Sequence, residues 1–219
     1  MCVMSYLSQT AHAFAKLTRY DPFEQNPDIL EYFGPGTSRT DSEKLMSGWI
    51  DPKTLEPIEM LDLRVGKITK VWKHENSTKL YCEEVDLGEE QPRQIASGLQ
   101  EFVPIERMQN SMVVVAANLK PRRVAGFMSH GMILWAENTN KTEVELLIPP
   151  SLWKPGDKIT VKGYKRHPLP ILKPKKKIFE SVVEDFFVDS QGIAKYKDAA
   201  WETEHGNITA SLITNGIIR

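Results

Sequence analysis

Hydrophobic and polar residues alternate with a period of two over residues 61–71, which predicts one long strand bent at Gly66. The same kind of pattern predicts strands at 80–87, 94–97, 112–117 and 131–136, a turn at 88–90, and a helical turn or two at 105–108. Five short strands with an insertion between the third and the fourth favour a mainly β protein. The expected architecture is a partly open five-stranded Greek-key barrel of the oligonucleotide-binding type. Sandwiches produce similar patterns, so periodicity leaves this topology open.

The segments on either side of the predicted barrel have different patterns. Apolar residues recur near helical spacing over 6–17, and a second helix is predicted to start at Asn26-Pro27-Asp28 and to stop before a linker over 34–57. After the barrel we expect a strand at 157–163, a helix at 178–187, and strands at 193–201 and 208–213. The chain is therefore divided into a helical and linker N-terminal extension (1–56), a barrel (57–157) and a C-terminal module (158–219).

Composition narrows the class of protein. The chain has 219 residues, of which 41% are hydrophobic, so it can bury a core without a disulfide or a metal. Two cysteines cannot form a disulfide framework, and Cys82 lies in an alternating stretch as a small buried side chain would, which favours a reducing cytoplasm. No apolar run approaches the roughly 20 residues of a membrane span, and no signal-peptide pattern is present. We expect a soluble, cytoplasmic protein with no membrane partner.

The charges are unevenly distributed along the chain. The formal net charge is −1, from 28 basic and 29 acidic residues, which argues against a polycation. Residues 1–56 contain 5 basic and 8 acidic side chains, so 23 basic and 21 acidic residues remain in 57–219. An acidic N-terminal extension therefore masks a mildly basic remainder, and a nucleic-acid partner stays possible.

Two segments concentrate the positive charge. Between Lys158 and Phe179 there are eight basic residues and no acidic one. Lys and Arg neutralise phosphates and make binding steeply salt-dependent, although a solvated loop or a nuclear-import-like patch would have the same composition. The second cluster, 118–123, follows the fourth predicted strand, where the loops of such a barrel hold ligands. The amide of Asn118 can both donate and accept, as base or ribose edges require.

The sequence contains no recognisable catalytic constellation. Its five histidines are scattered, without a metal-ligand neighbour at i+3 or i+4. No glycine-rich phosphate loop, nucleophile elbow, or synthetase signature of the His-Ile-Gly-His or Lys-Met-Ser-Lys-Ser type occurs. We expect a protein that is not an enzyme and holds no cofactor and no metal.

An ordered series of motifs runs along the chain: Leu61-Asp62-Leu63-Arg64-Val65-Gly66-Lys67-Ile68, Glu83-Glu84-Val85-Asp86-Leu87-Gly88, Asn118-Leu119-Lys120-Pro121, Ser129-His130-Gly131-Met132, and Leu172-Lys173-Pro174-Lys175-Lys176-Lys177-Ile178-Phe179-Glu180. This series resembles the tRNA-binding domain of the endothelial monocyte-activating polypeptide II family. The resemblance covers roughly three quarters of the chain. That family is similar to the C-terminal appendages of eukaryotic tyrosyl- and some methionyl-tRNA synthetases, and to free-standing synthetase assembly cofactors.

The resemblance implies an oligonucleotide-binding barrel with a C-terminal module that packs on it and imitates a dimer interface, so that the protein is a monomer. It implies recognition of tRNA without sequence specificity and delivery of tRNA to an attached or partner synthetase or to complex components. Folded RNA is recognised through phosphates, 2′-hydroxyls and unstacked bases. Backbone geometry is an alternative explanation for Gly98 and Gly131, and core packing is the favoured explanation for Met132. The expected RNA-binding residues are Arg64, Lys67, Ser97, Asn118, Lys120, Arg122, Arg123, Ser129, Lys173, Lys175, Lys176 and Lys177.

Two departures from the family pattern bear on the alternatives. The stretch Arg64–Lys70 resembles the family's cytokine-like heptapeptide only over its first five positions. Residues 1–56 match neither the long coiled helices nor the transferase-like N-terminal regions found in some relatives. The alternative hypothesis is a scaffold of a multi-synthetase complex, or a cytokine-like protein, with incidental RNA binding. In that case the acidic N-terminal extension would dock to other proteins.

Overall fold

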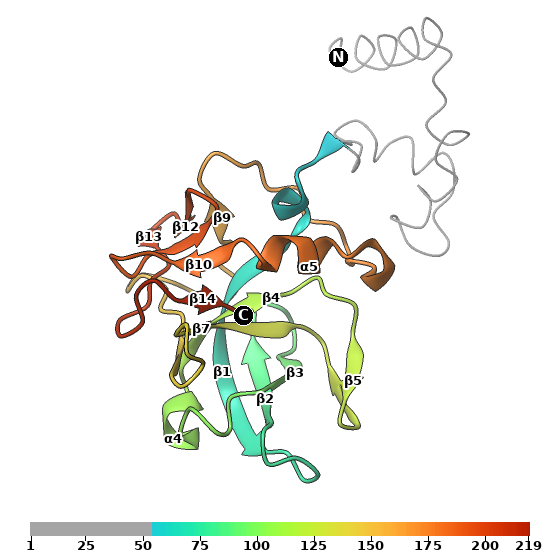
Figure 1. Ribbon diagram of the computed structural model, residues 1–219. Coiled ribbons are helices and arrows are strands. Elements are labelled where there is room, and N and C mark those ends of the chain that lie inside the picture. The colour runs from blue at the N-terminus through green and yellow to red at the C-terminus, as the bar shows by residue number, and fades with distance from the viewer. Residues whose placement is uncertain (1–53) are drawn as a thin grey trace, which may run out of the picture. The chain divides into compact units, whose positions relative to one another are not determined.

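The computed structural model describes residues 54–219. The helices predicted within 1–56, and nearly all of the linker, lie outside the described residues. Residues 51–219 form one compact unit. It is mainly β, and every pair of named strands is antiparallel. Figure 1 shows the strands of the first half below the short helix α5 (Ile178–Val183), with the late strands gathered to one side.

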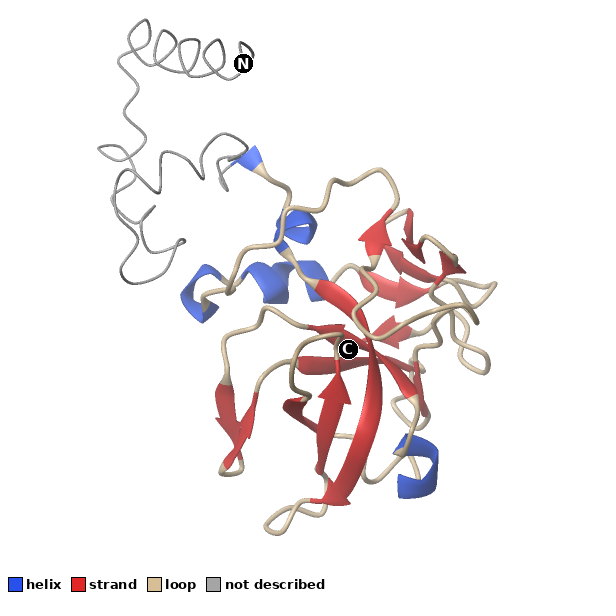
Figure 2. Cartoon of the chain, turned by 180° about the vertical axis from the view of Figure 1, so that it is seen from behind, coloured by secondary structure: helices blue, strands red, loops and turns tan. Residues whose placement is uncertain are grey.

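All five strands predicted for the first half are present. They lie side by side in the order β7-β4-β1-β2-β3, so β1 sits in the middle of the group. A single short helix follows β3, as the apolar stretch at 105–108 predicted, and Figure 2 shows the long β1 running through the molecule. The elements are β1 (Leu63–Lys73), β2 (Tyr81–Asp86), β3 (Arg93–Ser97), α4 (Ile105–Met108), β4 (Met112–Ala116) and β7 (Met132–Glu137).

The second half adds short strands to the same sheet. The last strand, β14, pairs with both β7 and β10, so the C-terminal strands continue the sheet of the first half. The 3-10 helix η4 precedes β1. The remaining elements are η4 (Pro57–Met60), β5 (Arg122–Val124), β6 (Phe127–Ser129), β8 (Val144–Leu146), β9 (Thr160–Val161), η5 (Pro174–Lys176), β10 (Phe186–Val188), β11 (Ala194–Tyr196), β12 (Ala199–Thr203), β13 (Gly206–Asn207) and β14 (Ile217–Ile218).

Several sequence predictions were wrong in this half. The helix predicted over 178–187 ends at Val183, because the apolar run then continues as β10, in which alternate side chains are buried. The single strand predicted over 193–201 is the hairpin β11–β12, turned at Lys197 with φ 50°. Its Lys-Asp turn lacks the Asn-Gly or Asp-Gly signal of tight hairpins. The segment 208–213 forms only isolated bridges at Thr209, and the loop expected after β4 contains the hairpin β5–β6.

The strand β4 is buried on both of its faces. Val113 and Val115 pack with β2 and β3 in one core, whereas Val114 and Ala116 face a second core formed with the C-terminal strands. Because neighbouring side chains of a strand point to opposite faces, a strand covered on both sides reads as an unbroken apolar run. This explains the apolar segment 112–117, and it makes residues 158–219 a necessary cover for the sheet.

The second core is centred on packed aromatic rings. Phe186 lies edge-to-face against Trp201 at 4.4 Å and against Tyr196 at 5.9 Å between ring centroids. Such contacts contribute about 0.5–1.5 kcal/mol each beyond burial. Cys82 is a buried free cysteine, as predicted, and burial raises its pKa to about 11.

The predicted bend at Gly66 is not observed there. The register of β1 against β2 shifts between Ile68 and Lys70, whereas Gly66 pairs regularly with Val113. The glycine is needed for close packing instead. A Cβ atom at position 66 would lie 2.7 Å from Val85 Cγ1 and 2.8 Å from Leu87 Cδ2.

We predict that Gly66→Ala lowers the free energy of unfolding by about 1–3 kcal/mol, the typical cost of overpacking a core. Gly98→Ala is the matched control, because a Cβ atom at Gly98 meets nothing within 4 Å. Urea unfolding of both variants measures the difference. Equal midpoints for the two variants would contradict the packing argument.

Candidate nucleic-acid interface

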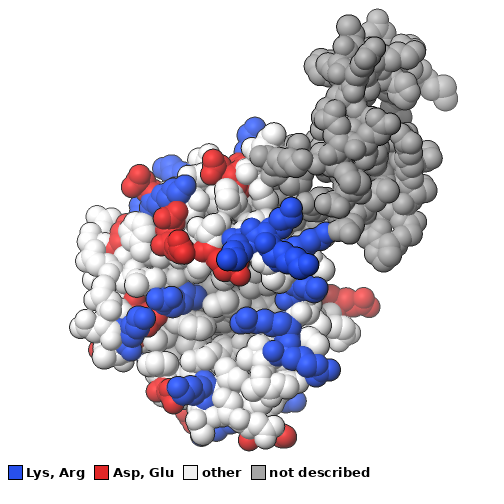
Figure 3. Space-filling model, turned by 45° about the vertical axis from the view of Figure 1, so that its right-hand side comes forward, with Lys and Arg blue, Asp and Glu red and all other residues white. Residues whose placement is uncertain are grey.

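A groove lies between β3, the segment that follows β4, and the segment that leads into α5. It has a volume of about 430 Å³. Five of the sequence-predicted RNA-binding residues line it: Ser97, Lys120, Arg122, Ser129 and Lys173. Figure 3 shows Lys and Arg side chains above and below an uncharged area on this side of the molecule. The remaining lining residues are Leu80, Ala96, Gly98, Leu119, Val124, Gly131, Met132, Trp135, Leu172, Pro174, Ile178, Phe179 and Glu180.

The two basic segments of the sequence meet at this groove. Leu119 and Leu172 form an isolated parallel bridge, and the backbone N–H of Leu172 donates to the carbonyl of Asn118 at 2.7 Å. This pairing places Lys120 and Lys173 on the same groove, although more than fifty residues separate them in the sequence. Three further lysines are exposed but do not line the groove: Lys175 and Lys176 in η5, and Lys177 directly after it.

Asn118 has a structural role. Its side chain is buried, with 4% of the residue exposed. Nδ2 donates to the carbonyls of Met60 at 2.9 Å and Leu169 at 2.8 Å, and Oδ1 accepts from the N–H of Asp62 at 2.9 Å. The sequence interpretation assigned this amide to base or ribose edges, but the structure uses both of its polar atoms within the chain. Asn118 therefore holds the start of the β4–β5 loop against two distant segments.

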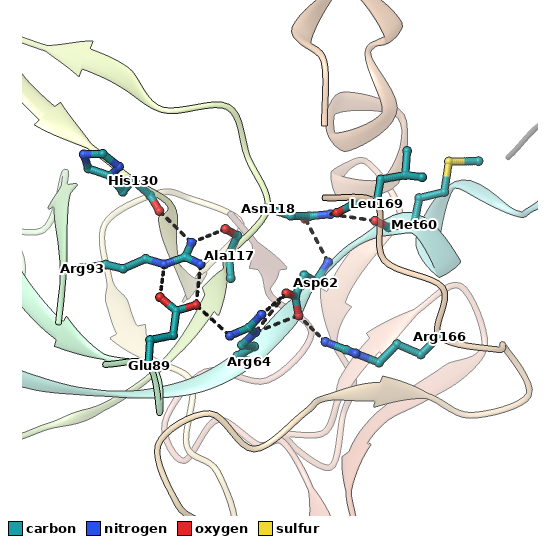
Figure 4. Close-up of polar contacts among 10 residues, drawn as sticks. All are labelled: Met60, Asp62, Arg64, Glu89, Arg93, Ala117, Asn118, His130, Arg166 and Leu169. Carbon is teal, nitrogen blue, oxygen red and sulfur yellow. Dashed lines mark hydrogen bonds and ion pairs between the residues drawn. The ribbon is translucent and has the colours of Figure 1, made fainter. Parts of the chain in front are cut away.

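A network of alternating charges joins Arg93, Glu89, Arg64, Asp62 and Arg166 (Figure 4). The carboxylate of Glu89 accepts from Arg93 and from Arg64 Nη1 at 2.9 Å. Arg64 in turn pairs with Asp62, which also accepts from Arg166. Arg64, Arg93 and Arg166 each pair with a carboxylate of this network, so the positive charges of these three guanidinium groups are already neutralised within the protein.

This network changes the role assigned to Arg64. The sequence placed Arg64 on the RNA-facing surface, whereas its guanidinium is directed at Asp62 and Glu89. Hydrogen bonding to Asp62 raises its pKa, with the charges of Asp62 and Glu89 adding to the effect. Lys67 is half-buried on β1 and does not line the groove.

Arg93 and Arg166 were not identified as functional residues from the sequence. Arg93 Nη1 donates to the carbonyls of Ala117 and His130, so it joins both ends of the segment between β4 and β7. Arg166 belongs to the stretch without acidic residues whose positive charge was assigned to phosphate binding, but its guanidinium forms an ion pair with Asp62. Glu89 and Arg93 are four residues apart, but they lie in a bend and at the start of β3, where this spacing does not indicate a pair as it would on a helix.

The hairpin β5–β6 presents two exposed arginines. Arg122 lines the groove, and Arg123 Nη1 donates to the carbonyl of Gly126 at 3.0 Å. At its other strand the hairpin is held by Phe127, whose ring lies edge-to-face with Trp72 at 5.9 Å. Ser129 Oγ accepts from the N–H of Ala96 at 3.0 Å, which ties the hairpin to β3. The hydroxyl of Ser129 is therefore structural.

A buried carboxyl lies under the β3 side of the groove. Glu83 on β2 is fully buried, and Ser97 donates to its Oε1, while its Oε2 has no protein partner. Burial raises the pKa of Glu83 to about 8, and the hydrogen bond from Ser97 only partly opposes this shift. The carboxyl is therefore mainly neutral at pH 7.

We predict that Glu83 makes the protein less stable as the pH rises from about 4.5 to 8. In this range the native carboxyl keeps a proton that the unfolded chain releases, so the free energy of unfolding falls by up to about 1.4 kcal/mol per pH unit. Glu83→Gln should remove this loss and be more stable than the parent above pH 8. Urea unfolding across this range, with Glu84→Gln on the half-exposed side of β2 as control, measures it. An unchanged pH dependence in Glu83→Gln would refute the assignment.

Other classes of site are not apparent in the described part of the chain. Residues 54–219 contain no group of three His, Cys, Asp or Glu side chains that could hold a metal ion. No helix within these residues is long and apolar enough to cross a membrane.

Comparison with known proteins gives a consistent family. A family model described as "Putative tRNA binding domain" matches residues 63–158. The crystal structure of the C-terminal domain of Plasmodium vivax p43 is similar with a TM-score of 0.70 and 32% identity, covering 75% of this chain and 100% of that one. All of that domain thus has a counterpart here.

Two curated relatives are much longer than this chain. The cytoplasmic methionine–tRNA ligase of Arabidopsis thaliana is 40% identical over 159 residues, which are 73% of this chain and 20% of that protein. The aminoacyl tRNA synthase complex-interacting multifunctional protein 1 of Mus musculus is 44% identical over 144 residues, 66% of this chain and 46% of that protein. The chain spans less than half the length of either relative.

Proposed function

Because the chain belongs to the tRNA-binding domain family that resembles endothelial monocyte-activating polypeptide II, we propose that it binds tRNA and delivers it to an aminoacyl-tRNA synthetase. It does so either as an appendage of the enzyme or as an assembly subunit. The observation that carries this proposal is the groove at which the two basic segments meet.

Phosphates are held by the side chains that remain exposed around the groove. Lys120 and Arg122 are exposed on its loop side, and the half-buried Lys173 lines it on the segment that pairs with this loop. Arg123 and Lys175 to Lys177 extend the basic surface beyond the lining. Contacts of this kind position RNA without reading its sequence, which suits a carrier of several different tRNAs.

The architecture in this proposal is an oligonucleotide-binding barrel formed by β1, β2, β3, β4 and β7. The strand order and the helix α4 between β3 and β4 support it. His130, just before β7, donates its backbone N–H to the carbonyl of Gln94 on β3 at 2.8 Å, which brings together the first and last strands of the order β7-β4-β1-β2-β3. Residues 57–157 then act as the RNA-binding body, and residues 158–219 as a module that imitates a partner subunit and keeps the protein monomeric.

The proposed role is non-catalytic, and its setting is the cytoplasm. The matched family is a binding domain, and the chain covers only a fifth of the Arabidopsis thaliana ligase. The Arabidopsis thaliana ligase that the chain resembles is a cytoplasmic enzyme by name.

We predict that Lys120→Ala weakens the binding of unrelated tRNAs about equally, and that it lowers the slope of log affinity against log salt by about one. Lys162→Ala, an exposed lysine outside the groove lining, is the control and should bind as the parent does. Filter binding or fluorescence anisotropy at about 50 and 200 mM salt measures both variants. An affinity that is insensitive to salt, or unchanged in Lys120→Ala, would contradict tRNA binding at this groove.

The second candidate function is a protein-interaction scaffold in which the acidic N-terminal extension (1–56) docks to a synthetase complex. We expect a shortened chain of residues 51–219, which is one compact unit, to keep tRNA affinity and to lose synthetase partners in a pull-down. Loss of tRNA binding with the partners retained would reverse the assignment. Retention of both would leave residues 1–50 without an assembly role.

A further inference from the structure

The inside of the groove is apolar, although its rim is basic. Leu80, Val124, Met132, Ile178 and Phe179 all line it and are only half-buried. Contacts to phosphates require none of these side chains. Exposed apolar surface enclosed by charged residues marks a place where an apolar group of a ligand is received. In a nucleic acid, the apolar groups are the faces of the bases.

The groove also has the size of a small-ligand site. Its volume of about 430 Å³ lies in the range of pockets that take ligands of nucleotide size. A base-paired stem keeps the faces of its bases stacked inside the helix, so it could offer only phosphates and riboses to this surface. An unpaired nucleotide exposes a flat face that can pack against Phe179.

The polar side chains inside the groove are already bonded within the protein. Ser97 donates to Glu83, and Ser129 donates to the carbonyl of Gly131 at 3.0 Å. They are therefore poorly placed to read the edge of a base. Among the lining residues one is acidic, Glu180, against three basic ones, so the mouth of the groove keeps a net positive charge.

From these observations we infer that the groove receives one unstacked nucleotide from an unpaired segment of RNA. Its base packs on the wall formed by Met132, Ile178 and Phe179, and its phosphate is held by Lys120, Arg122 or Lys173. Any base fits, since stacking on an aromatic ring depends little on base identity. The inference rests on the proposed tRNA binding and specifies which part of an RNA enters the groove.

The test compares two RNAs that differ only in an unpaired end. One is a blunt hairpin, and the other is the same hairpin with a four-nucleotide single-stranded 3′ extension. Fluorescence anisotropy with the full chain should give about tenfold tighter binding of the extended RNA. Extensions of four uridines, cytidines or adenosines should give affinities within a few-fold of one another.

Two variants test whether the tighter binding of the extended RNA depends on the groove. Gly98→Leu fills the groove from the end of β3, and it should fold, because a Cβ atom there meets nothing within 4 Å and the backbone is not left-handed. Phe179→Leu keeps an apolar side chain but removes the ring. Both should lose most of the difference in affinity between the extended RNA and the blunt hairpin. Phe187→Leu, a partly exposed phenylalanine on β10, is the control.

The outcomes separate this inference from the proposed function. Equal affinity of the parent chain for both RNAs, or a full advantage kept by Gly98→Leu, would overturn the nucleotide site while leaving tRNA binding in place. A strong preference for one base would overturn the stacking argument. Failure to bind tRNA or either hairpin at low salt would overturn both proposals.

Discussion

The burial of β4 on both faces is the constraint on which the rest of the structure depends. One face of this strand belongs to the core with β2 and β3, and the other requires the aromatic cluster of the C-terminal module. At roughly 25 cal/mol per Å² of buried apolar surface, neither face can be left in water without a large loss of stability. The C-terminal segment must therefore return to the strand from which the basic loop emerges. The position of the groove follows from this requirement.

Compensated and available positive charges are separated in space. The guanidinium groups of Arg64, Arg93 and Arg166 are bound by Asp62 and Glu89, whereas Lys120 and Arg122 are exposed and line the groove. Partly buried pairs of this kind fix geometry more than they add stability. Arg93 illustrates this, since it anchors the carbonyls at both ends of the segment that carries Lys120 and Arg122.

Burial of the Glu83 carboxyl lowers the stability of the folded protein, and hydrophobic packing gives no reason for a carboxyl at this position. A strongly shifted pKa beside a groove is typical of functional sites. Here the hydroxyl of Ser97, which lines the groove, is directed inward to Glu83. The groove surface thus presents apolar and basic groups, with few neutral polar ones. This composition is consistent with binding by stacking and charge rather than by recognition of base edges.

The amino-acid sequence alone determined the five strands of the first half, the short helix between the third and fourth, and the family, because alternation and motif order are local properties. It also identified the two basic segments. Only the tertiary structure decided which of these charges are available. Arg166 is 104 residues from its partner Asp62, and Asn118 is 58 residues from Met60, so no local pattern could show that these side chains are already bonded. The hairpin β11–β12 was missed because its Lys197-Asp198 turn lacks a glycine signal, and the late strands β10 to β13 are only two to five residues long. The sequence records which groups a chain has, whereas packing decides which of them remain free to bind.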